Sequence, residues 1–310
     1  MRKILLPLLL FCAAVAQAGA YAAEPEDFSF AVISPPRKGE TADTAQRAAI
    51  EDTDADNLAF VVANGIKAAD EPCTDKIYLQ RKALLQSAKN GLVVSLAAGD
   101  WAECRNANGK ASAIGKLNRL RDLFFGDEFS IGASRIPVIR QSTTAQFRDF
   151  PENARWAIGG IMFATINLPR NNNHYVFDAG RNGEFEDRLV ANRDWLQRVF
   201  MHAKRDRLDG IVLFCDGNPL ARPDGSGRKR DGFLEIRRQI GSLASKYHGE
   251  VLIVHGAATG SLASPRINWR DNIGEIAVGP GALKLVVNHS SPPLFSIAVS
   301  EAPQARNSHH

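Results

Sequence analysis

The chain has 310 residues, of which 45% are hydrophobic, and its formal net charge is +4 at pH 7. This near-neutral balance argues against nucleic acid as the main partner, because nucleic-acid-binding proteins carry a clustered basic face. The length suffices for one large α/β domain or two small ones, and we expect no membrane span, which takes about 20 consecutive apolar residues.

The first residues have the pattern of a secretory signal peptide. Arg2 and Lys3 precede an apolar stretch over residues 4–15, and small residues follow that allow cleavage after Ala18 or Ala22. We therefore expect residues 1–22 to be removed and the mature protein to be periplasmic or secreted.

Strand-like and helix-like patterns alternate along most of the remaining chain. This alternation indicates βαβ units and a largely parallel sheet, in a single domain over residues 23–300 with a frayed tail over 301–310. Residues 168–186 form a polar, Asn-rich loop, and the last three strand-like runs predict an antiparallel meander. The predicted strands cover residues 28–34, 58–63, 91–97, 157–166, 209–215, 250–255, 275–278, 283–287 and 294–299. The predicted helices cover residues 43–52, 75–89, 113–124, 187–205 and 231–247.

Cysteine usage agrees with export. Cys73 and Cys104 each lie in a loop just past a predicted strand, and an exported protein meets an oxidising compartment. We predict a disulfide between them, which would close a loop of about 30 residues and contribute about 3–4 kcal/mol. Cys215 ends an apolar run and is predicted to be a buried thiol.

Ionisable residues follow several of the apolar runs. Asp100, Glu103, Asp216 and His255 could converge at one sheet edge and form a single-metal or metal-free site. Alternatively, Asp100 and Asp216 accept hydrogen bonds from backbone donors in turns, and His255 is a structural histidine. We favour this second interpretation. The sequence contains no Gly-x-Ser-x-Gly elbow, no Gly-rich phosphate loop and no His-Glu-x-x-His.

Four stretches resemble, in order, the motifs of an exported branch of the calcineurin-like metallophosphoesterases. They are residues 28–34, 64–67, 99–104 and 254–259, and with shorter matches between them the resemblance covers about residues 28–298. It implies an α/β fold in which two mixed sheets form a β-sandwich flanked by helices.

The metal-ligand positions of that family are degenerate in this chain. Proline, isoleucine and alanine have no side-chain donor atom, and threonine is a poor ligand, so the dinuclear site cannot form as the family builds it. The resemblance therefore implies the fold and not the reaction. The residues at these positions are Pro35, Ile66, Ala257 and Thr259, and the Asn of the third motif is missing between Asp100 and Trp101.

The leading hypothesis is an exported, catalytically impaired metallophosphoesterase-like protein that keeps the cleft as a binding or interaction surface and needs no cofactor. One alternative is an active phosphoesterase that uses Asp100, Asp216 and His255, with one divalent metal ion or none. Another is a periplasmic partner protein that uses the Asn-rich loop; the sequence does not name the ligand or partner. Candidate cleft or anion-binding residues are Asn64, Lys67, Arg155, Asn167 and Asn218.

Overall fold

The computed structural model describes residues 26–36, 42–176, 182–222, 230–257 and 264–298. The predicted signal peptide and tail, and Thr259 among the family ligand positions, lie outside the described residues. Among the helices within the described ranges, none is long and apolar enough to cross a membrane.

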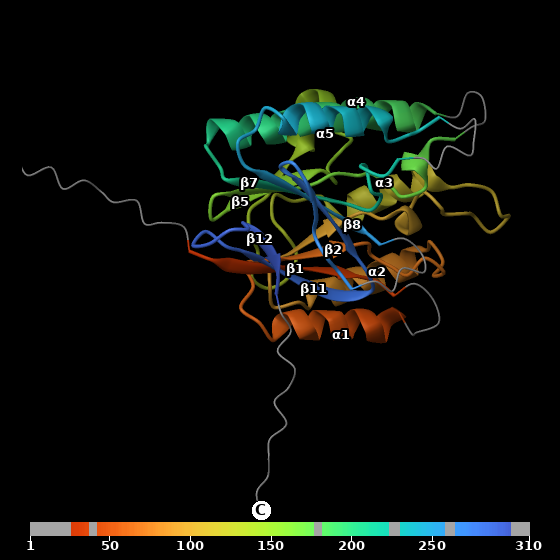
Figure 1. The fold of residues 1–310 in the computed structure, drawn as a ribbon. Helices are drawn as coiled ribbons and strands as arrows, with labels where there is room; N and C mark the ends of the chain where they lie inside the picture. Colours follow the sequence, from red (N-terminus) through yellow and green to blue (C-terminus); the bar gives the residue numbers. More distant parts are fainter. Residues whose placement is uncertain (1–25, 37–41, 177–181, 223–229, 258–263, 299–310) are drawn as a thin grey trace, which may run out of the picture.

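Two mixed β-sheets face one another at the centre of the molecule (Figure 1). The five-stranded sheet has the order β12-β11-β1-β2-β3 and the seven-stranded sheet the order β4-β5-β6-β7-β8-β10-β9. The first contains β12 (Phe295–Ile297), β11 (Gly281–Val287), β1 (Phe28–Ser34), β2 (Val61–Asn64) and β3 (Leu92–Ser95). The second contains β4 (Ile139–Arg140), β5 (Ala154–Ile158), β6 (Ile161–Thr165), β7 (Gly210–Cys215), β8 (Glu250–Gly256), β10 (Ile273–Val278) and β9 (Asn268–Arg270).

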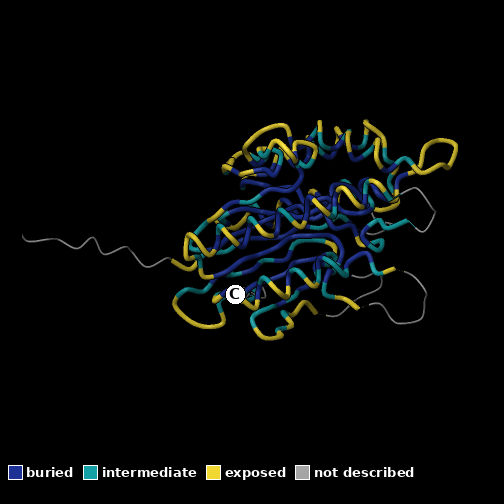
Figure 2. Tube along the Cα trace, turned by 90° about the horizontal axis from the view of Figure 1, so that it is seen from above, coloured by how far each residue is buried: buried dark blue, intermediate teal, exposed yellow. Residues whose placement is uncertain are grey.

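Helices cover the outer face of each sheet, which confirms the predicted sandwich. Helices α1 (Ala42–Asp54), α2 (Asp75–Gln86) and α3 (Ala113–Phe124) pack against the five-stranded sheet. Helices α4 (Gly183–Arg205) and α5 (Leu234–Ala244) lie side by side over the seven-stranded sheet (Figure 1). The exposed positions gather on the helices and loops, while the strands are buried (Figure 2).

In β2, β6 and β7 every residue is buried, because both faces of each sheet are covered there. Successive side chains of β7 point to opposite faces. Val212 and Phe214 enter the core between the sheets, where Phe30 contacts Phe214 with ring centroids 6.0 Å apart. Ile211 belongs to the core beneath α4 and α5. The side chains of one uninterrupted apolar run thus pack alternately into two hydrophobic cores.

Two details of the strand predictions are corrected. Residues 157–166 were predicted as one strand, but the chain turns at Gly159 and Gly160, which have φ of 51° and 73°, and β5 and β6 pair antiparallel. The last strands do not form one meander. β10 pairs parallel with β8 and antiparallel with β9, whereas β11 crosses to the other sheet, where it lies antiparallel to β1 and β12.

Candidate functional site

A cleft opens where the carboxyl ends of the parallel strands meet. In this class of fold, ligands bind at the carboxyl edge of the sheet because the loops that follow the strands converge there. The cavity is about 160 Å³ in volume, and both sheets contribute to it. Its lining comes from the loops after β1, β2, β3, β6, β8 and β10 and includes Pro35, Asn64, Lys67, Glu103, Arg170 and Ala257.

Asp100 lies at this edge, fully buried at the end of a short 3₁₀ helix, Ala98–Asp100. Its Oδ1 accepts hydrogen bonds from the backbone amides of Ile66 at 3.0 Å and Lys67 at 3.2 Å, and its Oδ2 accepts from Ala97 N at 2.8 Å. Burial raises the pKa of Asp100 to about 6, although these hydrogen bonds and the charge of Lys67 oppose the shift. The carboxylate therefore joins the loops after β2 and β3.

Asp216 follows β7 and makes a second set of bonds between loops. Its Oδ2 accepts from Ala98 N at 2.8 Å and from Arg170 N at 2.9 Å, while its Oδ1 accepts from Arg170 Nε at 2.9 Å. The side chain of Asp216 is only 1% exposed. Since Ala98 follows β3 of one sheet and Arg170 follows β6 of the other, Asp216 ties the two sheets together at the cleft.

His255 lies at the end of β8 and is 7% exposed. Its Nδ1 is 3.0 Å from the carbonyl oxygen of Gly256. Burial lowers the pKa of His255 and so favours the neutral imidazole, while the Gly256 hydrogen bond and the charges of Glu275 and Asp216 oppose the shift. His255 does not line the cavity.

The three candidate catalytic residues thus reach one sheet edge without forming a common set of ligands. Asp100 and Asp216 accept bonds at adjacent backbone amides, those of Ala97 and Ala98. Within the ranges that the structure describes, no group of three or more His, Cys, Asp and Glu side chains could hold a metal ion. The arrangement matches the interpretation in which Asp100 and Asp216 accept hydrogen bonds from backbone amides in turns.

Three of the positions at which the resembled family carries metal ligands lie within the described residues, and none of the three supplies a donor to this cleft. Pro35 and Ala257 line the cavity, and Ile66 is completely buried in the core against the helices of the five-stranded sheet. None of these side chains carries a donor atom for a metal. A dinuclear centre of the family type therefore does not fit these three residues.

Two of the candidate cleft residues line the cavity. Asn64 is buried and donates from Nδ2 to Cys215 O at 3.1 Å. Lys67 donates from Nζ to the carbonyl oxygens of Ala68 at 3.1 Å and Glu71 at 2.7 Å. Burial lowers the pKa of Lys67, although Asp100 and Glu71 oppose the shift. Lys67 and the Nδ2 atom of Asn64 are thus engaged with the protein itself, whereas Asn64 Oδ1 is buried without a hydrogen-bond partner among the described residues.

The other three candidates lie elsewhere and do not line this cavity. Arg155 is on β5, and burial lowers its pKa. At the end of α4, Arg205 lowers this pKa further and Asp206 raises it. Asn167 donates to Glu152 Oε1 at 3.0 Å in a buried polar network. Asn218 donates to Glu275 Oε2 at 2.9 Å.

Arg170 is the cleft residue that sequence reasoning missed. Its side chain is 42% exposed, lines the cavity and pairs with Asp216. Burial disfavours its charge, but the hydrogen bonds and charge of Asp216 outweigh burial and raise the pKa of the guanidinium. The only signal in the sequence was its position: Arg170 follows β6 and the buried residues 166–169 that continue it.

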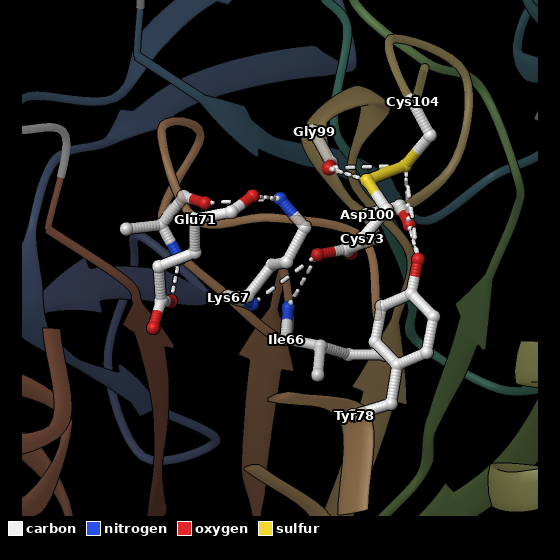
Figure 3. The surroundings of a disulfide bond; sticks show 9 residues. Ile66, Lys67, Glu71, Cys73, Tyr78, Gly99, Asp100 and Cys104 are labelled. Carbon is white, nitrogen blue, oxygen red and sulfur yellow. Dashed lines mark hydrogen bonds between the residues drawn. A yellow bond between two sulfur atoms is a disulfide. The ribbon is translucent and has the colours of Figure 1, made fainter. Parts of the chain in front are cut away.

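The predicted disulfide between Cys73 and Cys104 is confirmed, with the two Cα atoms 5.8 Å apart. It joins the loop after β2 to the loop after β3, beside Asp100 (Figure 3). The hydroxyl of Tyr78 donates to Asp100 O at 2.7 Å in the same cluster. Cys215 is a buried free thiol, as predicted, and burial raises its pKa. A disulfide fits an oxidising compartment.

The Asn-rich loop is held by its own side chains. Asn172, Asn173 and His174 have φ between 53° and 55°, a left-handed conformation that asparagine tolerates better than most residues. Asn173 is completely buried, accepts from Arg188 Nη1 at 2.5 Å and donates to Gly232 O at 3.0 Å. The asparagines therefore brace this loop against α4 and the segment before α5.

No family model matches the chain, and no curated protein matches it. Among solved structures, one similar chain is "GAP50 the anchor in the inner membrane complex of Plasmodium", with 12% identity and a TM-score of 0.48 over 84% of this chain and 81% of that one. A hypothetical protein from Thermus thermophilus has 12% identity and a TM-score of 0.43, over 89% and 100%. TT1561 of the same organism has 8% identity and a TM-score of 0.43, over 87% and 98%.

Proposed function

We propose that this chain is an exported, catalytically impaired protein with a metallophosphoesterase-like fold, which serves as a binding or interaction module. The observation that carries the proposal is the use of the two cleft carboxylates. Both oxygens of Asp100 and both oxygens of Asp216 accept hydrogen bonds from backbone amides or from Arg170. Each carboxylate thus holds neighbouring loops together, whereas in a catalytic site its oxygens would be available to a metal ion or a substrate.

The charges at the cleft also favour a structural role for these side chains. Arg170 is neutralised by Asp216, and Lys67 lies beside Asp100 and donates to two carbonyl oxygens. A metal ion bound to either carboxylate would lie beside these cations, and each backbone amide that it displaced would lose its partner at a cost of about 1–3 kcal/mol. A general base would need an unengaged carboxylate or imidazole.

The alternative of an active phosphoesterase predicts a clear result in a turnover assay. The disulfide-bonded protein, without its first 22 residues, is incubated with a chromogenic phosphomonoester and a phosphodiester in the presence of manganese, zinc or iron. We expect no metal-dependent turnover above that of Asp100→Ala and His255→Ala, because both oxygens of Asp100 accept backbone hydrogen bonds and His255 does not line the cleft cavity. Turnover that both substitutions abolish would establish the hydrolase and overturn the proposal.

A partner role for the Asn-rich loop receives less support. Asn173 is buried, and Asn172 donates to the backbone of Arg230 at 3.0 Å, so these side chains are occupied within the protein. Deleting residues 170–175 would also remove Arg170 from Asp216. A cleaner test replaces the half-buried Asn171 with Ala, which introduces no charge beside its buried Oδ1 position, and compares recovery of a co-purified partner.

A further inference from the structure

Helices α4 and α5 lie side by side over the outer face of the seven-stranded sheet (Figure 1). Residues of both helices line a groove there. The groove has a volume of about 630 Å³, much larger than the cleft. Arg193 and Lys204 line it from α4, and their 11-residue separation corresponds to about 16 Å along a helix. Arg238 lines it from α5, and Lys246 from the turn that follows.

The cations of the groove are exposed and largely unpaired. Arg193, Lys204 and Lys246 have no ion pair among the described residues, and Arg238 is only 3.7 Å from Glu235, the one carboxylate in the lining. Four cations therefore face one anion along the groove. Unbalanced positive charge of this kind attracts an anionic partner and raises its rate of association.

Two other arginines of α4 provide a contrast within the same helix. Arg188 pairs with Glu184 at 2.6 Å, and Arg198 pairs with Asp194 at 2.6 Å. Carboxylates four residues earlier balance these two arginines, whereas the residue four positions before Arg193 is Leu189. The helix thus concentrates its unpaired charge on the side that faces α5.

Apolar side chains line part of the groove, between polar ones such as Gln197, Gln239 and Ser242. Phe200 and Leu243 contribute to it, and Met201 is 49% exposed at its side. Methionine adapts its shape to varied partners, and a purely polar polyanion such as a sulfated glycan would leave this apolar surface without a match. An occupant that fits has carboxylates on its flanks and apolar side chains between them.

We propose that the α4–α5 groove is the docking site for an acidic amphipathic helix of a partner protein. A helix laid in a groove presents apolar residues at i, i+3, i+4 and i+7, and glutamates beside that stripe would meet the cations on both walls. The groove lies outside the cleft and uses none of its residues. The inference therefore goes beyond the proposed function and stands whether or not the cleft is catalytic.

The test uses a synthetic helix as the probe. A fluorescein-labelled peptide of about 20 residues, with leucines along one face and glutamates elsewhere, is titrated with the protein and followed by fluorescence anisotropy. We expect saturable binding by the wild-type protein. The triple variant Arg193→Glu/Arg238→Glu/Lys246→Glu should bind at least about tenfold more weakly, because attraction becomes repulsion on both walls.

A matched control carries the same change of net charge on another surface. Lys76, Lys89 and Lys110 are exposed and lie outside the groove, so Lys76→Glu/Lys89→Glu/Lys110→Glu should bind like the wild type. Far-UV circular dichroism and thermal melting establish that both triple variants fold.

Several results would overturn the proposal. The first is the absence of binding by the wild type. The second is an equal loss in both triple variants, which would show attraction by net charge alone. The third is equal affinity for a peptide with glutamine in place of every glutamate. The last is groove-dependent binding of heparin or of phosphatidylglycerol vesicles without binding of the acidic peptide, which would assign the groove to another occupant.

Discussion

Removing the carboxylate of Asp216 should destabilise the protein, because this side chain holds loops of both sheets together. In Asp216→Ala, the backbone amides of Ala98 and Arg170 lose their acceptor, the first in a buried and the second in a partly buried setting. Each unpaired donor costs about 1–3 kcal/mol, so the free energy of unfolding should fall by about 2–6 kcal/mol. The ion pair adds little to this sum, because the Arg170 side chain is 42% exposed and solvent screens its charge.

The assay is urea unfolding of the disulfide-bonded protein, followed by tryptophan fluorescence. Asp216→Asn keeps one side-chain oxygen as an acceptor and should lose less, about 1–3 kcal/mol. Asp122→Ala removes a carboxylate outside the cleft and should stay within about 0.5 kcal/mol of the wild type. If Asp216→Ala unfolds at the same free energy as Asp122→Ala, the assignment of Asp216 as the link between the sheets is wrong.

Three further predictions concern residues around the cleft. The pKa of Asp100 is raised to about 6, so the folded state binds a proton that the unfolded state has released above its ordinary pKa of 3.8. Its contribution to the free energy of unfolding should therefore rise by about 2 kcal/mol as pH falls from about 6.5 to about 4.5. In urea titrations Asp100→Asn should lack this rise. If the pH profiles of the two proteins run parallel, the raised pKa of Asp100 is wrong. Replacing Cys73 and Cys104 with serine should lower the free energy of unfolding by about 3–4 kcal/mol, and an unchanged urea midpoint would show that the crosslink constrains little. Asn173→Ala should lower the free energy of unfolding by about 2–4 kcal/mol, because Arg188 loses a buried acceptor and alanine is strained at φ 53°. Asn173→Gly should recover the part that is due to backbone strain. Equal losses in the two variants would argue against such strain.

The sequence predicted the elements whose periodicity is clear. The strand over 28–34 and the helix over 113–124 have the observed bounds, because an apolar run and an amphipathic repeat mark them without ambiguity. The run over 157–166 was misjudged because its two glycines stand inside an apolar stretch, where a hairpin turn is easily overlooked. The sheet that β10 or β11 joins depends on its partner strand, and for β11 this partner is β1, which lies about 250 residues earlier in the sequence.

The site was predictable in its location more than in its bonds. Parallel strands bring Asp100, Asp216 and His255 to one edge, and this follows from the alternation of strands and helices. The partners of Asp216 do not follow from local pattern, because Ala98 is 118 residues away in the sequence. Arg170 was missed because a polar loop has no periodicity from which a side-chain direction could be inferred.

The most direct test of the central claim is the metal content of the mature protein. The protein without residues 1–22 is produced with its disulfide formed, purified without chelator or polyhistidine resin, dialysed against manganese, zinc and iron, and analysed by elemental mass spectrometry. We predict far less than one ion per chain, because Pro35, Ile66 and Ala257 offer no donor and the oxygens of Asp100 and Asp216 are already bonded. One or more tightly bound ions per chain, lost in Asp100→Ala or Asp216→Ala variants that remain folded, would contradict the account.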